Sequence, residues 1–185
     1  MRQVVIIAGT GGQGVVSAGE ILAQVAHEEG YGVTYMTQYS PEVRGGWVAA
    51  TVVLGDGQVG SPVAGKADTV LLLSNQAVQE YRHCVKKNGL LIVNTSLAED
   101  VHADGERLVE IPATEVAQKI GDERATNMLM LGAYSEVSGV VSLDSAEHAL
   151  KTVLPERHHD AIPANMKALR QGAELARENL KTQQS

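Results

Sequence analysis

The first residues of this chain constrain its fold more than any other part. An apolar run, Val4 to Ala8, enters the loop Gly9-Thr10-Gly11-Gly12-Gln13-Gly14, and a helix-like segment follows. The glycines Gly9, Gly11 and Gly14 match the G-x-G-x-x-G spacing, which permits a tight turn, close approach of the backbone to an anion, and close packing of helix on strand. The pattern predicts a strand, an anion-binding loop and a helix whose first amides point toward a ligand.

The segment after the second apolar run departs from the usual dinucleotide pattern. Residues 33–36 are followed by Thr37, Gln38 and Tyr39, so no acidic side chain stands at this strand tip to hold a ribose hydroxyl. The chain continues instead as Tyr39-Ser40-Pro41-Glu42-Val43-Arg44-Gly45-Gly46.

Apolar runs and amphipathic runs alternate along the first two thirds of the chain. This alternation predicts an α/β fold, with three α/β/α layers and a Rossmann-like, mostly parallel sheet. Strands are expected near residues 3–8, 32–37, 47–54, 69–74, 90–94 and 107–111. The part after residue 112 is expected to be helical, and nothing resembles an interdomain linker, so residues 1–185 are expected to form a single domain.

Helices are predicted from the spacing of apolar residues and from stop and cap signals. Asn88-Gly89 is expected to end the second helix, Asp144 or Ser142 to cap the helix near residue 145, and Asn127 to cap a buried helix near the glycine loop. The predicted helices cover residues 14–29, 75–87, 113–120, 127–137, 145–153 and 163–180.

Composition excludes several classes of protein. A formal charge of −7 and a pI near 5.3 argue against non-specific nucleic-acid binding, which depends on clustered Lys and Arg. No signal-peptide pattern opens the chain and no apolar stretch is long enough to span a membrane, so a cytoplasmic location is expected. The single cysteine, Cys84, excludes an internal disulfide and an iron-sulfur cluster ligated by this chain's cysteines alone.

Three motifs taken in order resemble one family. The loop from Gly9 to Val15, the stretch from Tyr39 to Gly46, and the later Val59-Gly60-Ser61-Pro62 are similar to the gamma subunit of 2-oxoacid:ferredoxin oxidoreductases. That resemblance implies a multi-subunit enzyme that oxidatively decarboxylates a 2-oxoacid, with 2-oxoglutarate as the best guess, and forms an acyl-coenzyme A.

The resemblance also implies where the chemistry is held. Thiamine diphosphate with its Mg²⁺ belongs to the alpha and beta subunits, and the iron-sulfur clusters to the beta subunit or to a delta subunit. Electrons then leave to ferredoxin through the complex. This chain is expected to bind no cofactor firmly and to contribute no catalytic or metal-binding residue, but to serve as scaffold and as one side of a coenzyme A cleft. Homodimerisation of the isolated chain is left open.

Two roles are possible for the site residues expected from these motifs. They bind an anion, such as the phosphates of coenzyme A, or they lie at a subunit seam. Gln13 either donates its amide to an anion or pins the loop. Arg44 is expected to pair with Glu42 or with a carboxylate of another subunit, with direct contact to substrate or cofactor as the alternative. The candidates are Gly9, Gly11, Gly12, Gln13, Gly14 and Arg44.

The remaining signals are weaker. The segment from Gln38 to Trp47 is expected to face a partner subunit, with Trp47 as an anchor in the interface or the core. Cys84 is expected to pack rather than react, and the adjacent His158 and His159 to be solvated rather than to bind metal. Two other functions stay open: a stand-alone nucleotide-binding oxidoreductase domain, and a pure interaction subunit without a ligand.

Overall fold

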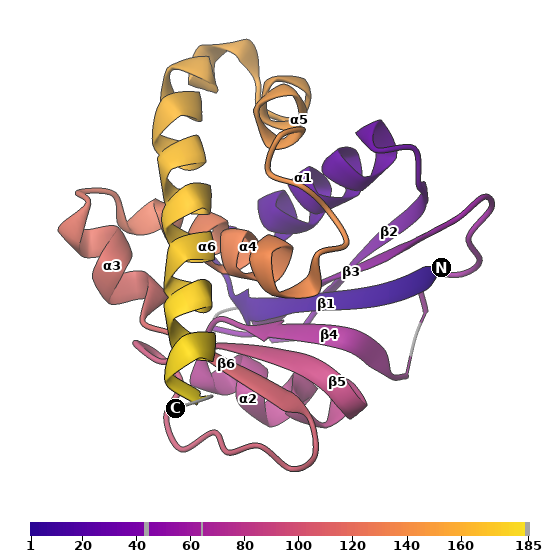
Figure 1. The fold of residues 1–185 in the computed structure, drawn as a ribbon, viewed down its shortest axis with the longest axis vertical. Coiled ribbons are helices and arrows are strands. Elements are labelled where there is room, and N and C mark those ends of the chain that lie inside the picture. The colour runs from indigo at the N-terminus through magenta and orange to yellow at the C-terminus, as the bar shows by residue number, and fades with distance from the viewer. Residues whose placement is uncertain (43–44, 64, 184–185) are drawn as a thin grey trace.

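One mixed sheet organises the structure, a computed structural model that describes residues 1–42, 45–63 and 65–183 (Figure 1). Within these ranges six strands lie in the order β2-β3-β1-β4-β5-β6. Each overlaps a predicted strand, although one of them, β5, begins earlier than its expected start at residue 90. Their bounds are β1 (Arg2–Thr10), β2 (Gly32–Tyr39), β3 (Trp47–Gly55), β4 (Ala67–Leu72), β5 (Val85–Asn94) and β6 (Arg107–Ile111).

The six strands do not all run in the same direction. β1 is parallel to β4, β4 to β5 and β5 to β6, whereas β3 is antiparallel to both β1 and β2. The expected α/β fold with a mostly parallel sheet is therefore confirmed, with β3 as the reversed strand. The connection from β2 to β3, residues 40–46, is too short for a crossover helix, so these two strands pair as antiparallel neighbours.

The helices cover the two faces of the sheet unequally (Figure 1). Alternate residues of β1 point to opposite faces: Val5 and Ile7 join the larger core with the N-terminal and C-terminal helices, and Val4 and Ile6 the smaller one. The larger core includes residues of α1 (Val15–Glu28), α3 (Ala113–Lys119), α4 (Thr126–Ser138), α5 (Ala146–Val153) and α6 (Ile162–Gln183); the smaller face is covered by α2 (Asn75–Tyr81).

The helix α4 is buried along most of its length, and α6 crosses over it in close contact. A Cβ on Gly132 of α4 would lie 1.9 Å from the carbonyl oxygen of Leu169, and a Cβ on Gly172 of α6 would lie 1.9 Å from that of Leu129. The two glycines therefore let the helix backbones approach more closely than any side chain would allow. This crossing fixes α6 over the sheet.

The predicted end of the second helix is wrong. The second helix does not reach residue 87: α2 ends at Tyr81, a 3₁₀ turn covers Arg82–Cys84, and β5 begins at Val85. Asn88, at φ 64°, and Gly89 lie inside β5 instead of ending a helix, at the irregularity where the pairing with β4 passes from Val85 to Leu90.

The expected caps in the C-terminal part are also wrong. The N-cap of α5 is Ser145, which makes no side-chain cap bond, and Ser142 Oγ accepts from the Asp144 amide. The helix α4 begins at Thr126, so Asn127 lies inside its first turn rather than at the cap. Among the described residues no helix is long and apolar enough to cross a membrane.

Candidate functional site

The glycine loop lies at the carboxyl end of β1, where the chain turns into α1. Gly14 has φ 70°, and a Cβ there would lie 2.4 Å from Nδ2 of Asn127. That same amide group donates a 3.0 Å hydrogen bond to the Gly14 carbonyl. Gly14 is thus required both by its backbone conformation and by the side chain that packs on it, and Asn127 does lie beside the loop as the sequence suggested.

Gln13 turns inward and braces the loop. Its Oε1 accepts from the Thr10 amide at 2.7 Å, and its Nε2 donates to the Leu73 carbonyl at 3.1 Å. Of the two roles that the sequence left open for Gln13, the structure displays the second. Gly9 makes room for it, because a Cβ on Gly9 would lie 2.5 Å from Gln13 Oε1.

The outer side of the loop is open. No described atom lies within 4 Å of a Cβ built on Gly11 or Gly12, and of these two only Gly12 has a positive φ, 90°. The fold therefore does not require a glycine at position 11. An approaching ligand could use that space, because a glycine there lets the backbone come close to it.

The first amides of α1 point toward the open side of the glycine loop. The first bond inside the helix joins the Ala18 amide to the Gly14 carbonyl, so the amides of residues 15–17 have no helical partner. The first turn of α1 carries no acidic side chain. This end of the helix therefore keeps its partial positive charge, which favours an anion.

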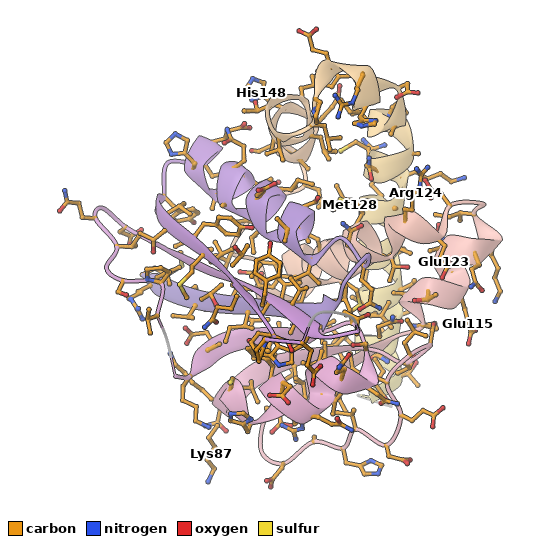
Figure 2. The ribbon with its side chains drawn as sticks, turned by 180° about the vertical axis from the view of Figure 1, so that it is seen from behind. Lys87, Glu115, Glu123, Arg124, Met128 and His148 are labelled. Carbon is orange, nitrogen blue, oxygen red and sulfur yellow. The ribbon has the colours of Figure 1, made fainter. Side chains whose placement is uncertain are left out.

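A cavity of about 250 Å³ opens beside the loop. Its wall combines the glycine loop with the loop after β5, the start of α3, the 3₁₀ turn Glu123–Ala125 and the first residue of α4. Figure 2 shows Glu123 and Arg124 on that turn, with Glu115 of α3 nearby. The lining residues are Gly12, Gln13, Leu97, Thr114, Glu123, Arg124 and Thr126.

Arg124 supplies a cation at the rim of the cavity. Its Nε lies 2.9 Å from Asp122 Oδ1, and hydrogen bonding to this carboxylate raises the pKa of Arg124 and lowers that of Asp122. The Arg124 side chain is 88% exposed, so its second face is open to solvent. A guanidinium held this way can accept a further anionic partner.

Two residues that sequence reasoning missed, Asn94 and Thr114, support the cavity from behind. Asn94 is fully buried at the end of β5, and its Nδ2 donates to the Leu73 carbonyl at 3.1 Å and to Thr114 Oγ1 at 2.9 Å. The available signal was position: a polar residue directly after a buried strand, at the edge where the parallel strands β1, β4 and β5 end.

The second motif lies beside the glycine loop. β1 and β3 pair Thr10 with Trp47, so the β2–β3 connection leaves the sheet next to the loop. Arg44 lies outside the described residues, as does Val43. The described neighbours Gln38, Tyr39 and Glu42 are exposed, and Tyr39 is 61% exposed.

Other candidates from the sequence are not part of this site. Trp47 packs its ring edge-on against Tyr81, with centroids 5.2 Å apart, and is half-buried in the smaller core. Burial raises the pKa of the Cys84 thiol, which disfavours a reactive thiolate. The Nε2 of His159 contacts the Leu154 carbonyl at 2.9 Å, and no group of three potential metal ligands occurs in the described ranges.

Comparison with known families identifies the chain. Residues 4–175 match the family described as Pyruvate ferredoxin/flavodoxin oxidoreductase. The chain belongs to this family. The likeness to an oxidoreductase gamma subunit, expected from the three motifs, is confirmed.

The relatives include both free subunits and longer chains. The 2-oxoglutarate synthase subunit KorC of Methanothermobacter marburgensis is 34% identical, over 98% of this chain and 100% of KorC. The ketoisovalerate oxidoreductase subunit VorA of the same organism is 35% identical over 94% of this chain, which spans only 36% of VorA. The gamma subunit of a keto/oxoacid ferredoxin oxidoreductase from Geobacter sulfurreducens superposes with a TM-score of 0.81 at 29% identity, covering 95% of this chain and 99% of that one.

Proposed function

We propose that this chain is the gamma subunit of a 2-oxoacid:ferredoxin oxidoreductase complex. Such a complex converts a 2-oxoacid and coenzyme A to an acyl-coenzyme A and CO₂ and transfers two electrons to ferredoxin. The observation that carries the proposal is the end-to-end match to KorC, a free subunit of the same length class. A chain that corresponds to a whole subunit is expected to act as one.

For the substrate we propose 2-oxoglutarate. The support is that the KorC relatives of two Methanothermobacter species align along nearly their whole length at 34% identity. Ketoisovalerate is the alternative, since VorA matches at 35% identity over part of its length.

The role proposed for this chain is to hold the phosphates of coenzyme A at the glycine loop. The support is chemical. The start of α1 has free amides and no acidic side chain in its first turn, and Gly11 has open space around it. The next loop residues, Gly12 and Gln13, line a cavity together with Arg124, whose guanidinium can pair with an anion. The oxidation itself is assigned to the alpha, beta and, where there is one, delta subunits, which would hold thiamine diphosphate, Mg²⁺ and the iron-sulfur clusters. The single cysteine of this chain, Cys84, does not fit a cluster site.

The test is reconstitution with the partner subunits and a panel of substrates. We expect viologen or ferredoxin reduction only in the complete complex, with the highest kcat/KM for 2-oxoglutarate among 2-oxoglutarate, pyruvate, ketoisovalerate and indolepyruvate. A higher kcat/KM for ketoisovalerate would overturn the substrate assignment and leave the subunit assignment standing. Turnover by this chain alone would overturn the subunit assignment.

The pure interaction subunit is the second candidate, and the internal bonding of both polar ends of Gln13 favours it. The two candidates differ at Gly11, because the fold leaves the space around this residue open. In the assembled complex Gly11→Val should raise the KM for coenzyme A at least fivefold if the loop binds phosphate. An unchanged KM with weakened subunit assembly would favour the interaction role.

A further inference from the structure

The carbonyl of Leu73, at the tip of β4, joins two elements of the candidate site. It accepts from Gln13 Nε2 and from Asn94 Nδ2, each at 3.1 Å. A carbonyl oxygen has two lone pairs, so these two side chains saturate it. Leu73 itself is fully buried, and its amide is bonded to the Ala8 carbonyl, which fixes the position of this oxygen.

Asn94 uses its whole amide group on this side of the sheet. Its Nδ2 donates to the Leu73 carbonyl and to Thr114 Oγ1, while its Oδ1 accepts from the Thr114 amide at 3.3 Å. Its main-chain carbonyl accepts from the Leu97 amide at 3.1 Å. One buried residue therefore holds the tip of β4, the first turn of α3 and the loop after β5.

The bonds form a continuous line from the glycine loop to α3. The line runs from the Thr10 amide through Gln13, the Leu73 carbonyl and Asn94 to Thr114. Gln13, Leu97 and Thr114 line the cavity. Asn94 does not line it, yet it bonds directly to Leu97 and Thr114 and shares an acceptor with Gln13.

We propose that Asn94 is a positioning residue for the cavity at the glycine loop, which sets the spacing between that loop and α3. The affinity for the anionic ligand then depends on a side chain that never touches it, because a loosened loop must be reordered on binding. This inference rests on the proposed function, in which the ligand is coenzyme A.

The first arm of the test uses this chain alone and needs no ligand. Asn94→Ala should speed hydrogen exchange of the amides of residues 10–14 about tenfold relative to the amides of α6. Asn165→Ala is the matched control, since it removes one side-chain bond, from Asn165 Nδ2 to the Ala161 carbonyl, away from the cavity. Unchanged exchange in residues 10–14 would overturn the proposal. Asn94→Ser, which keeps a small polar group, replaces Asn94→Ala in every arm if the alanine variant does not fold.

The second arm uses the assembled complex. Asn94→Ala should raise the KM for coenzyme A about fivefold or more and change kcat less than twofold, whereas a purely structural brace would lower the yield of active complex without this split. A double-mutant cycle with Gln13→Ala should be non-additive, because both variants release the same carbonyl.

The outcomes separate this proposal from the function on which it rests. If Gly11→Val raises the KM for coenzyme A and Asn94→Ala does not, the positioning role is wrong and the ligand assignment stands. If hydrogen exchange of residues 10–14 increases in Asn94→Ala but neither variant changes the KM for coenzyme A, the cavity does not bind coenzyme A. The role of Asn94 in positioning that ligand is then also wrong.

Discussion

The glycines of the loop differ in what they do for the fold. Gly14 combines a left-handed backbone with a position where a Cβ would meet Asn127, whereas Gly11 has open space around it. We expect Gly14→Ala to lower the free energy of unfolding by about 2 kcal/mol, because strained backbone positions cost about 1–3 kcal/mol. Gly11→Ala should change it by less than about 0.5 kcal/mol.

Urea unfolding of the two variants in parallel measures this difference. Each substitution adds one methyl group to the same loop, so each variant is the control for the other. Equal losses of stability would show that the loop adopts another conformation in solution.

For individual residues, the sequence predicted the position of the loop but not the hydrogen bonds that hold it. The glycine spacing is a local pattern and could be read directly from residues 9–14. The bonds of Gln13 and Asn94 to the Leu73 carbonyl join positions that are distant along the chain, so no local pattern encodes them. Arg124 was missed because it becomes part of the cavity only through the packing of α3 and α4.

At the scale of elements, the crossing of α4 and α6 gives a prediction of unusual sign. Replacing a helical glycine by alanine normally stabilises a helix by about 1 kcal/mol. Here Gly132→Ala or Gly172→Ala should instead destabilise the protein by about 2 kcal/mol or more, because the new methyl group meets a backbone carbonyl of the facing helix.

Thermal and denaturant unfolding of these two variants measure the change in stability. Helix propensity alone would predict that both variants are more stable than the natural chain. A gain in stability from either substitution would mean that the two helices do not approach this closely. The double variant should cost less than the sum of the two, since one separation of the helices relieves both contacts.

The contact between α1 and α5 gives a pH dependence. Figure 2 shows His148 on α5, and its Nδ1 lies 2.7 Å from Glu28 Oε1. Burial raises the pKa of Glu28, but hydrogen bonds from Gln24 and His148 outweigh this, and the net pKa is below its usual value of 4.5. A lowered carboxyl pKa stabilises the fold above the unfolded value, and this stabilisation is lost as the pH falls through the folded pKa.

His148→Ala should therefore destabilise the chain at about pH 6 and have a diminishing effect below about pH 4.5, as Glu28 becomes protonated. The measurement is the difference in unfolding free energy between the variant and the natural chain across this range. A difference that stays constant down to about pH 3 would show that the contact does not depend on the Glu28 charge.

The elements also show why one helix end was predicted wrongly. Ala77, Val78, Tyr81 and Val85 fit a helical period, and Asn88-Gly89 resembles a helix stop. In the structure Val85 already belongs to β5, which pairs Val85 with Ala67, so tertiary pairing overrides the local signal. Apart from the start of β5, the positions of the six strands were predicted correctly, because their apolar runs leave few alternatives.

At the scale of the whole molecule, we expect the purified chain to be colourless and free of stoichiometric iron. Its single cysteine cannot complete the usual set of cluster ligands, so visible absorbance should come only from partner subunits. Metal analysis and an absorption spectrum, each before and after assembly, provide the check. Iron in the isolated chain at one or more equivalents would contradict the assignment of the clusters to the partners.

The crossing of α4 by α6 also affects how the chain folds during its synthesis. Residues 126–135 of α4 are all buried, but Gly172 and its neighbours, which help to cover them, follow much later in the chain. Ribosomes add about 5–20 residues per second, so synthesis of residues 139–172 takes roughly 2 to 7 s. Residue 172 therefore leaves the ribosome later than α4 by the same interval, during which α4 lacks its cover from α6 and offers a chaperone apolar surface to bind.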